Sequence, residues 1–124
     1  MANPEFRCQV QPEFMPDASD PAQPLYAFKY TVTVRNTGDV AAQLIGRHWV
    51  ITDASGRTEE VRGLAVVGHQ PLLQPGEEFR YESWTRLATP QGHMRGTYFC
   101  MSVDCEPFEA EVPAFLLSQG QALH

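Results

Sequence analysis

The sequence is poor in basic residues and has no long apolar run. It holds 9 Lys and Arg against 15 Asp and Glu among 124 residues, a formal net charge of −6 at pH 7. An acidic chain lacks the basic face that binds nucleic-acid phosphates. No apolar stretch approaches the length of a membrane span, and the N-terminal segment lacks the charged and apolar regions of a signal peptide. We therefore expect a cytoplasmic protein with no nucleic-acid partner and no membrane insertion.

Cysteine is also scarce, and its spacing excludes the common cysteine-based metal sites. The three cysteines are Cys8, Cys100 and Cys105, with no C-x-x-C pair among them. Without an export signal, these thiols are expected to stay free in a reducing compartment. No H-E-x-x-H zinc motif is present. His69 and His93, both expected in or beside loops, remain as candidate ligands for a divalent metal.

Catalytic motifs and helical periodicity are absent too. There is no G-x-S-x-G nucleophile elbow, and no cysteine has a histidine beside it in the sequence. We therefore expect neither an enzymatic activity nor a cofactor. No long segment has apolar side chains at helical spacing. The fold class predicted from these absences is all-β.

What the sequence does contain is a regular alternation of apolar and polar residues, the pattern of half-buried strands. Its 9 Gly and 10 Pro are scattered along the chain, many of them between the alternating segments, and Pro75-Gly76 is one of the structural turns that they form. About seven strands are predicted in a single domain of residues 1–124, with an ordered core of about 6–117. The segments expected as strands are 6–14, 26–35, 42–52, 58–67, 79–87, 94–103 and a last one around 108–112. Either an antiparallel sandwich or an up-and-down barrel fits this order.

One local pattern favours the sandwich. Tyr98 precedes Cys100 by two residues after a turn, the spacing of a tyrosine corner in immunoglobulin-like domains, where the hydroxyl bonds to the backbone. Trp49 lies on a middle strand, as the core tryptophan of those domains does. Segment 26–35 has no cysteine that would pair with Cys100, so Cys100 is interpreted as a small core residue. These residues predict an immunoglobulin-like or fibronectin type III-like β-sandwich.

The segment Gly63-Leu64-Ala65-Val66-Val67-Gly68 nearly spells the G-x-G-x-x-G phosphate loop, with Ala65 in place of the middle glycine. A dinucleotide site needs that glycine and a helix N-terminus behind it, whereas here Gln70-Pro71 follows. The segment therefore has two interpretations, a bulged strand end with a tight loop or a site for a phosphorylated ligand. The candidate binding residues in it are Gly63, Val67, Gly68, His69, Gln70 and Pro71.

Trp84 is the other candidate contact residue. It falls on the polar side of its predicted strand, among Arg80, Glu82 and Arg86. Interface centres favour Trp, Tyr and Arg, so an exposed Trp84 suits a protein partner. The alternative is that a bulge or a covering segment buries the side chain.

Several long motifs resemble the ApaG family, and together they run from about residue 6 to residue 117. They include Arg47-His48-Trp49-Val50-Ile51-Thr52-Asp53, Val66-Val67-Gly68-x-Gln70-Pro71-x-Leu73-x-Pro75-Gly76-Glu77, Gly92-x-Met94-x-Gly96-x-Tyr98 and Pro113-x-Phe115. The resemblance implies a small bacterial cytoplasmic protein with a fibronectin type III-like sandwich. The family usually has glycine where this chain has Ala65 and where it has Trp84.

The resemblance also implies a function. Family members are labelled as cobalt and magnesium efflux proteins, and the same domain is fused to F-box and polymerase-interacting proteins in eukaryotes. A chain of this size without a membrane span cannot itself move ions across a bilayer. We therefore expect a non-enzymatic protein-interaction module with an unidentified protein partner and an indirect link to cobalt and magnesium homeostasis. The alternatives are binding of a phosphorylated ligand or dinucleotide by loop 63–71, and direct binding of a divalent metal.

Overall fold

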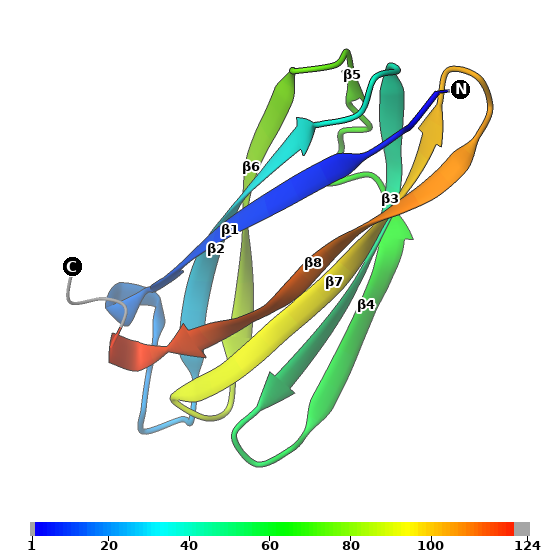
Figure 1. Cartoon of the computed structure of the whole chain (residues 1–124). Coiled ribbons are helices and arrows are strands. Elements are labelled where there is room, and N and C mark those ends of the chain that lie inside the picture. The colour runs from blue at the N-terminus through cyan, green and yellow to red at the C-terminus, as the bar shows by residue number, and fades with distance from the viewer. Residues whose placement is uncertain (1, 121–124) are drawn as a thin grey trace.

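The computed structural model describes residues 2–120, which form two antiparallel β-sheets and contain no α-helix (Figure 1). In chain order the elements are β1 (Phe6–Phe14), a 3-10 turn η1 (Pro16–Ala18), β2 (Tyr26–Asn36), β3 (Ala42–Asp53), β4 (Thr58–Leu64), β5 (Leu72–Leu73), β6 (Glu78–Leu87), β7 (Gln91–Ser102) and β8 (Pro107–Ser118). The all-β sandwich predicted from the alternation is confirmed. Within the described residues, no helix is long and apolar enough to span a membrane.

The two sheets have different sizes and different edges. One has the strand order β1-β2-β6, and the other has the order β4-β3-β7-β8 with β5 paired to β3. β1 packs against β8, which closes one side of the sandwich. β4 and β6 are the terminal strands on the other side, so two free strand edges remain there. In Figure 1, β1 and β8 are neighbouring ribbons that both run from upper right to lower left.

Most strand limits match the alternation, and the exceptions have local causes. The strand expected at 58–67 ends at Leu64, because Ala65 has a φ of 67°, which a strand residue cannot adopt. β7 begins at Gln91 instead of Met94, and β8 continues to Ser118. The two-residue β5 was not predicted, because two residues are too few to show an alternation.

The core forms around Trp49, as expected for this class of sandwich. Its indole makes edge-to-face contacts with Tyr98 (ring centroids 5.8 Å apart) and Tyr30 (5.7 Å). Cys100 is buried, which confirms its interpretation as a core residue. The expected tyrosine corner is wrong: the Tyr98 hydroxyl forms its hydrogen bond with the Tyr81 hydroxyl of the opposite sheet, not with the backbone. The bond joins the two sheets inside the core.

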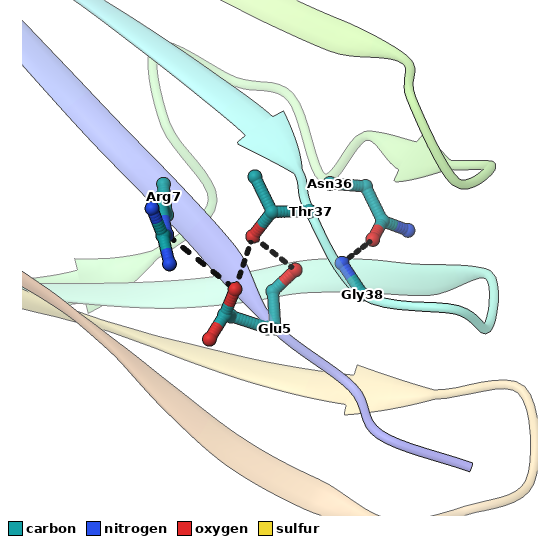
Figure 2. Close-up of polar contacts among 5 residues, drawn as sticks. All are labelled: Glu5, Arg7, Asn36, Thr37 and Gly38. Carbon is teal, nitrogen blue, oxygen red and sulfur yellow. Dashed lines mark hydrogen bonds and ion pairs between the residues drawn. The ribbon is translucent and has the colours of Figure 1, made fainter.

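A buried asparagine holds the corner at the end of β2. The side-chain amide of Asn36 donates to the carbonyls of Val40 and Leu73, both at 2.9 Å. Its side-chain oxygen accepts from the Gly38 amide at 2.9 Å (Figure 2). Its backbone carbonyl accepts from Gly76, which has a φ of 88° and completes the predicted Pro75-Gly76 turn. One residue, through its side chain and its backbone, therefore connects β2, β5 and two turns.

The outer surface of the same corner carries an exposed polar cluster. Figure 2 shows the Glu5 carboxylate, which accepts a hydrogen bond from the Thr37 hydroxyl at 2.7 Å and pairs with Arg7 at 3.4 Å. Exposed pairs of this kind contribute little to stability, because water solvates both partners when they separate. Asn36, which is buried, therefore contributes more to the corner than these surface contacts do.

Candidate functional site

The open side of the sandwich holds a cleft of about 610 Å³ between the edge strands β4 and β6. Its walls come from four strands, with β2 and β3 at the bottom and the two edge strands at the rim. The lining residues are Tyr30, Arg47, Trp49, Ile51, Glu59, Val61, Ser83, Trp84, Thr85 and Arg86. We take this cleft as the candidate functional site.

Arg47 has an unusual position for a charged residue. It alternates in phase with Trp49 and Ile51 on β3, so its side chain enters the space between the sheets instead of pointing to solvent. One guanidinium nitrogen donates to the carbonyls of Leu64 (3.0 Å) and Ala65 (2.9 Å). These contacts fix the guanidinium at one end of the cleft.

Gly63 provides the room that this guanidinium needs. A Cβ at position 63 would lie 2.8 Å from the nearer Arg47 nitrogen and 3.2 Å from the guanidinium carbon. Since real side chains do not approach so closely, any residue other than glycine would displace Arg47. The first glycine of the near phosphate-loop motif therefore has a structural role in placing an arginine.

The polar floor of the cleft consists of hydroxyl groups beside that arginine. Burial raises the pKa of Tyr30, while its hydrogen bond with Ser83 and the positive charge of Arg47 act in the opposite direction. The Tyr30 hydroxyl therefore stays protonated at neutral pH and remains a hydrogen-bond donor. Tyr30, Ser83 and Arg47 together place neutral and cationic donors at the bottom of the cleft.

The rim of the cleft carries an exposed aromatic residue and a second arginine. Trp84 is 54% exposed, as its place on the polar side of β6 predicts. Arg86 is exposed two residues further on the same strand, and Glu59 of β4 lines the cleft on its other edge. Removing the exposed indole surface from water lowers the free energy. Trp84 is therefore suited to pack against a bound partner.

The glycine-containing segment forms a tight turn next to the cleft. Val67 (φ 49°) and Gly68 (φ 80°) occupy the two central positions, both left-handed, as in a type I′ turn. Val66 and His69 exchange backbone hydrogen bonds of 2.8 and 2.9 Å across it. The Ala65 amide donates to the Ile45 carbonyl at 2.8 Å. These amides are therefore engaged in the backbone and do not point together toward a phosphate.

The rest of the segment is attached to β3. The Gln70 side chain donates to the Ile45 carbonyl, and the Gln43 side chain donates to the Gln70 carbonyl, both at 2.9 Å. The Pro71 carbonyl accepts from the Leu44 amide at 3.1 Å. In residues 2–120 no α-helix follows the turn, so the helix N-terminus of a dinucleotide site is not present there.

The two candidate metal ligands lie at opposite ends of the sandwich. His69 contacts the Phe79 ring (centroids 5.6 Å apart) near the Ile45 end of β3, whereas His93 pairs with Thr52 near the other end. A separation of seven strand residues corresponds to roughly 20 Å. The two histidines are therefore too far apart to share one ion. Within the described part of the chain, no three His, Cys, Asp or Glu side chains gather in a metal-binding group.

The sequence pattern named Trp84 and its neighbour Arg86 as a candidate contact, but it did not associate Tyr30, Arg47 or Ser83 with them. For Arg47 a signal was present: a charged residue in the inward phase of a strand, beside Trp49, is unusual in a half-buried pattern. Tyr30 and Ser83 had no such signal, since their place in the cleft depends on which strands form the edges of the two sheets.

The comparisons agree with the fold and with the motifs. The family model of the ApaG domain matches residues 16–102. Protein ApaG of Ralstonia nicotianae is 53% identical over 124 residues and is covered over its full length, as is this chain. Protein ApaG of Methylobacillus flagellatus is 55% identical, with 96% of this chain and 94% of that protein covered. A crystal structure from Bordetella pertussis superposes with a TM-score of 0.91 at 51% identity, covering 93% of this chain and 94% of that one.

The fold first defines the chain as an antiparallel β-sandwich of two sheets, and the matches then define its family. The chain belongs to the ApaG family. The resemblance drawn from the sequence motifs is confirmed over nearly the whole chain.

Proposed function

We propose that this ApaG-family chain is a non-enzymatic protein-interaction module of the cytoplasm, which binds its partner through the cleft between β4 and β6. The observation that carries the proposal is the exposed Trp84 at the mouth of a cleft bounded by two free strand edges. Buried aromatic residues and arginines account for most of the binding energy at protein interfaces. Free strand edges are a frequent site for the addition of a partner segment.

The proposal is tested by comparing what the full chain captures from a bacterial lysate with what two variants capture. Trp84→Ala is expected to lose at least three quarters of the specifically captured partner, measured by quantitative mass spectrometry. Phe99→Ala is the matched control, because Phe99 is also an exposed aromatic residue (43%) but lies on β7, away from the cleft. Equal capture by the wild type and by Trp84→Ala would contradict the proposal.

We further propose that any effect on cobalt or magnesium homeostasis passes through the bound partner. The support for this is the distance between His69 and His93, which prevents them from acting together on one ion. Titration calorimetry with Co²⁺ and Mg²⁺ tests it on the metal-free chain. A saturable binding heat that disappears in His69→Ala or in His93→Ala would contradict an indirect role.

The alternative of a phosphorylated ligand at loop 63–71 has less support. The Ala65, Val66 and His69 amides already donate to backbone carbonyls. An NMR titration with ATP distinguishes the two functions, because the alternative requires saturable shifts at the amides of Gly68 and Gln70. No shift is expected there on our proposal.

A further inference from the structure

We propose that the cleft accepts an extended acidic segment of the partner protein, with a carboxylate directed toward the Arg47 and Arg86 side chains. This inference rests on the proposed function, and it adds the chemistry of the partner. It is drawn from the charges, the shape and the edges of the cleft.

The charge of the cleft is opposite to that of the whole chain. Two arginines and one glutamate line it, although acidic residues outnumber basic ones in the chain by 15 to 9. Neither Arg47 nor Arg86 forms an ion pair with another of residues 2–120. Arg47 uses one nitrogen for two carbonyls, so further N–H groups of its guanidinium stay available. A carboxylate is the group that complements such donors best.

The floor of the cleft adds donors of the right kind. The hydroxyls of Tyr30 and Ser83 lie beside Arg47, and hydroxyl groups donate readily to a carboxylate oxygen. Glu59 is the one acidic side chain among the lining residues, and it belongs to the β4 rim. We therefore place the partner carboxylate on the β3 and β6 side of the cleft, away from Glu59.

The length of the hollow favours a segment over a small anion. A second hollow of about 160 Å³ shares Ile51, Glu59 and Arg86 with the cleft and continues it to Asp53. From Arg47 to Asp53 the strand rises by roughly 20 Å, the length of about six extended residues. Both neighbouring strands, β4 and β6, have one unpaired edge, which offers backbone hydrogen bonds to an added strand.

The experiment begins from random peptides, so it requires no identified partner. Random twelve-residue peptides displayed on phage are selected on the full-length chain, and the affinities of the enriched peptides are measured by fluorescence anisotropy. Enriched peptides are expected to contain more Asp and Glu than the starting library. Replacing their acidic residues by Asn or Gln is expected to weaken binding about tenfold or more, the effect of losing one charge-assisted hydrogen bond.

Two matched variants locate the binding site. Arg86→Gln is expected to weaken binding of the acidic peptides about tenfold. Arg80→Gln is expected to leave it within about twofold. Arg80 is also exposed on β6 but lines a different hollow, together with Gln9 and Thr33. Because both replaced side chains are exposed, the variants are expected to fold like the wild type.

The other outcomes separate this inference from the proposed function. Peptides that need Trp84 but neither acidic residues nor Arg86 would overturn the acidic partner and leave the interaction cleft standing. Peptides indifferent to both Trp84→Ala and Arg86→Gln, or no enrichment at all, would overturn the inference together with the cleft as the binding surface. Inorganic pyrophosphate that alone shifts the amides of Ser83 and Arg86 as strongly as a peptide does would assign the cleft to a phosphorylated small molecule instead.

Discussion

Among single residues, Ala65 has a backbone conformation that its side chain disfavours. Its φ of 67° belongs to the left-handed region, which a Cβ disfavours, and Val67 two residues later has a φ of 49°. Ala65 also contacts the cleft, because its carbonyl accepts a hydrogen bond from Arg47. The strained residue is therefore one of the two whose carbonyls bind the cleft arginine.

Replacing Ala65 by glycine is expected to stabilise the chain. The substitution removes the left-handed strain but gives the unfolded chain more freedom, so the expected gain in the free energy of unfolding is about 0.5–1 kcal/mol. Urea denaturation followed by tryptophan fluorescence measures it. Ala88→Gly is the control, since Ala88 has no positive φ, and it is expected to destabilise slightly. Equal effects of the two substitutions would contradict the assigned strain.

Asn36 gives the second prediction for a single residue. Asn36→Ala removes the donor to the carbonyls of Val40 and Leu73 and leaves buried acceptors unpaired, so a loss of about 2–4 kcal/mol in the free energy of unfolding is expected. Thr37→Ala, which removes only exposed contacts with Glu5, is expected to cost about 0.5 kcal/mol or less. Thermal unfolding by circular dichroism compares the two. A similar cost for both variants would show that Asn36 does not hold the corner.

The sequence indicated some of these residues and not others. Pro75-Gly76 and Cys100 follow from their residue types, because turns and small core positions have characteristic chemistry. The role of Tyr98 was mistaken, because its spacing from Cys100 does not say whether Tyr81 of the opposite sheet lies within reach of its hydroxyl. Contacts between sheets depend on how the sheets stack, which local spacing does not contain.

At the scale of elements, the pairing of β3 with β7 is adapted to one large side chain. Gly96 lies opposite Trp49, and a Cβ on it would be 2.5 Å from the indole ring and 2.9 Å from the His48 carbonyl. The register of β7 against β8 shifts between Met94 and Gly96, where the strand bulges. The glycine and the bulge together let β7 pass close to the core tryptophan.

Gly96→Ala is therefore expected to destabilise the pairing of β3 with β7. Neither the indole nor the backbone carbonyl can move away without disturbing the core, so a loss of about 2–3 kcal/mol is expected. Thr97→Ala is the control on the neighbouring position, whose side chain alternates to the other face, and about 0.5 kcal/mol is expected for it. Chemical denaturation and the near-ultraviolet dichroism of Trp49 are the measurements. An unchanged tryptophan signal and stability in Gly96→Ala would contradict the close approach.

The strands were the most predictable elements, since alternation over nine or more residues marks them directly, as in β1 and β2. The end of β4 was not predictable, because the alternation of residue types does not show that Ala65 adopts a left-handed φ. The cleft was not predictable either. It exists because β4 and β6 lack further neighbours, and strand order depends on the whole topology.

For the whole molecule, the thiols of the partly buried Cys8 and the buried Cys100 give a dependence of stability on pH. Burial raises the pKa of Cys8 and of Cys100 from 9.0 to about 12 in the folded chain. In the unfolded chain the thiols ionise at their ordinary pKa, so the folded state keeps these protons when the unfolded state has lost them. The stabilisation is therefore complete below about pH 9 and is lost progressively up to about pH 12.

Under reducing conditions, the contribution of these thiols to the free energy of unfolding is thus expected to stay constant between pH 7 and 8.5. It should fall by about 1 kcal/mol per buried thiol by pH 10. Urea denaturation at closely spaced pH values measures this decrease. Cys100→Ala, although less stable, is expected to show a smaller decrease over the same range. An equal slope in the variant and the wild type would exclude Cys100 as a source of the dependence.

The order of strands within the two sheets has a consequence for the time course of folding. β2 does not pair with β3, which follows it in the chain, but with β6, which lies beyond β3, β4 and β5. The three-stranded sheet therefore stays incomplete on a ribosome until residues beyond Leu87 have emerged. Because pairings between distant segments form slowly, refolding of the complete chain is expected on a scale of milliseconds to seconds, not microseconds.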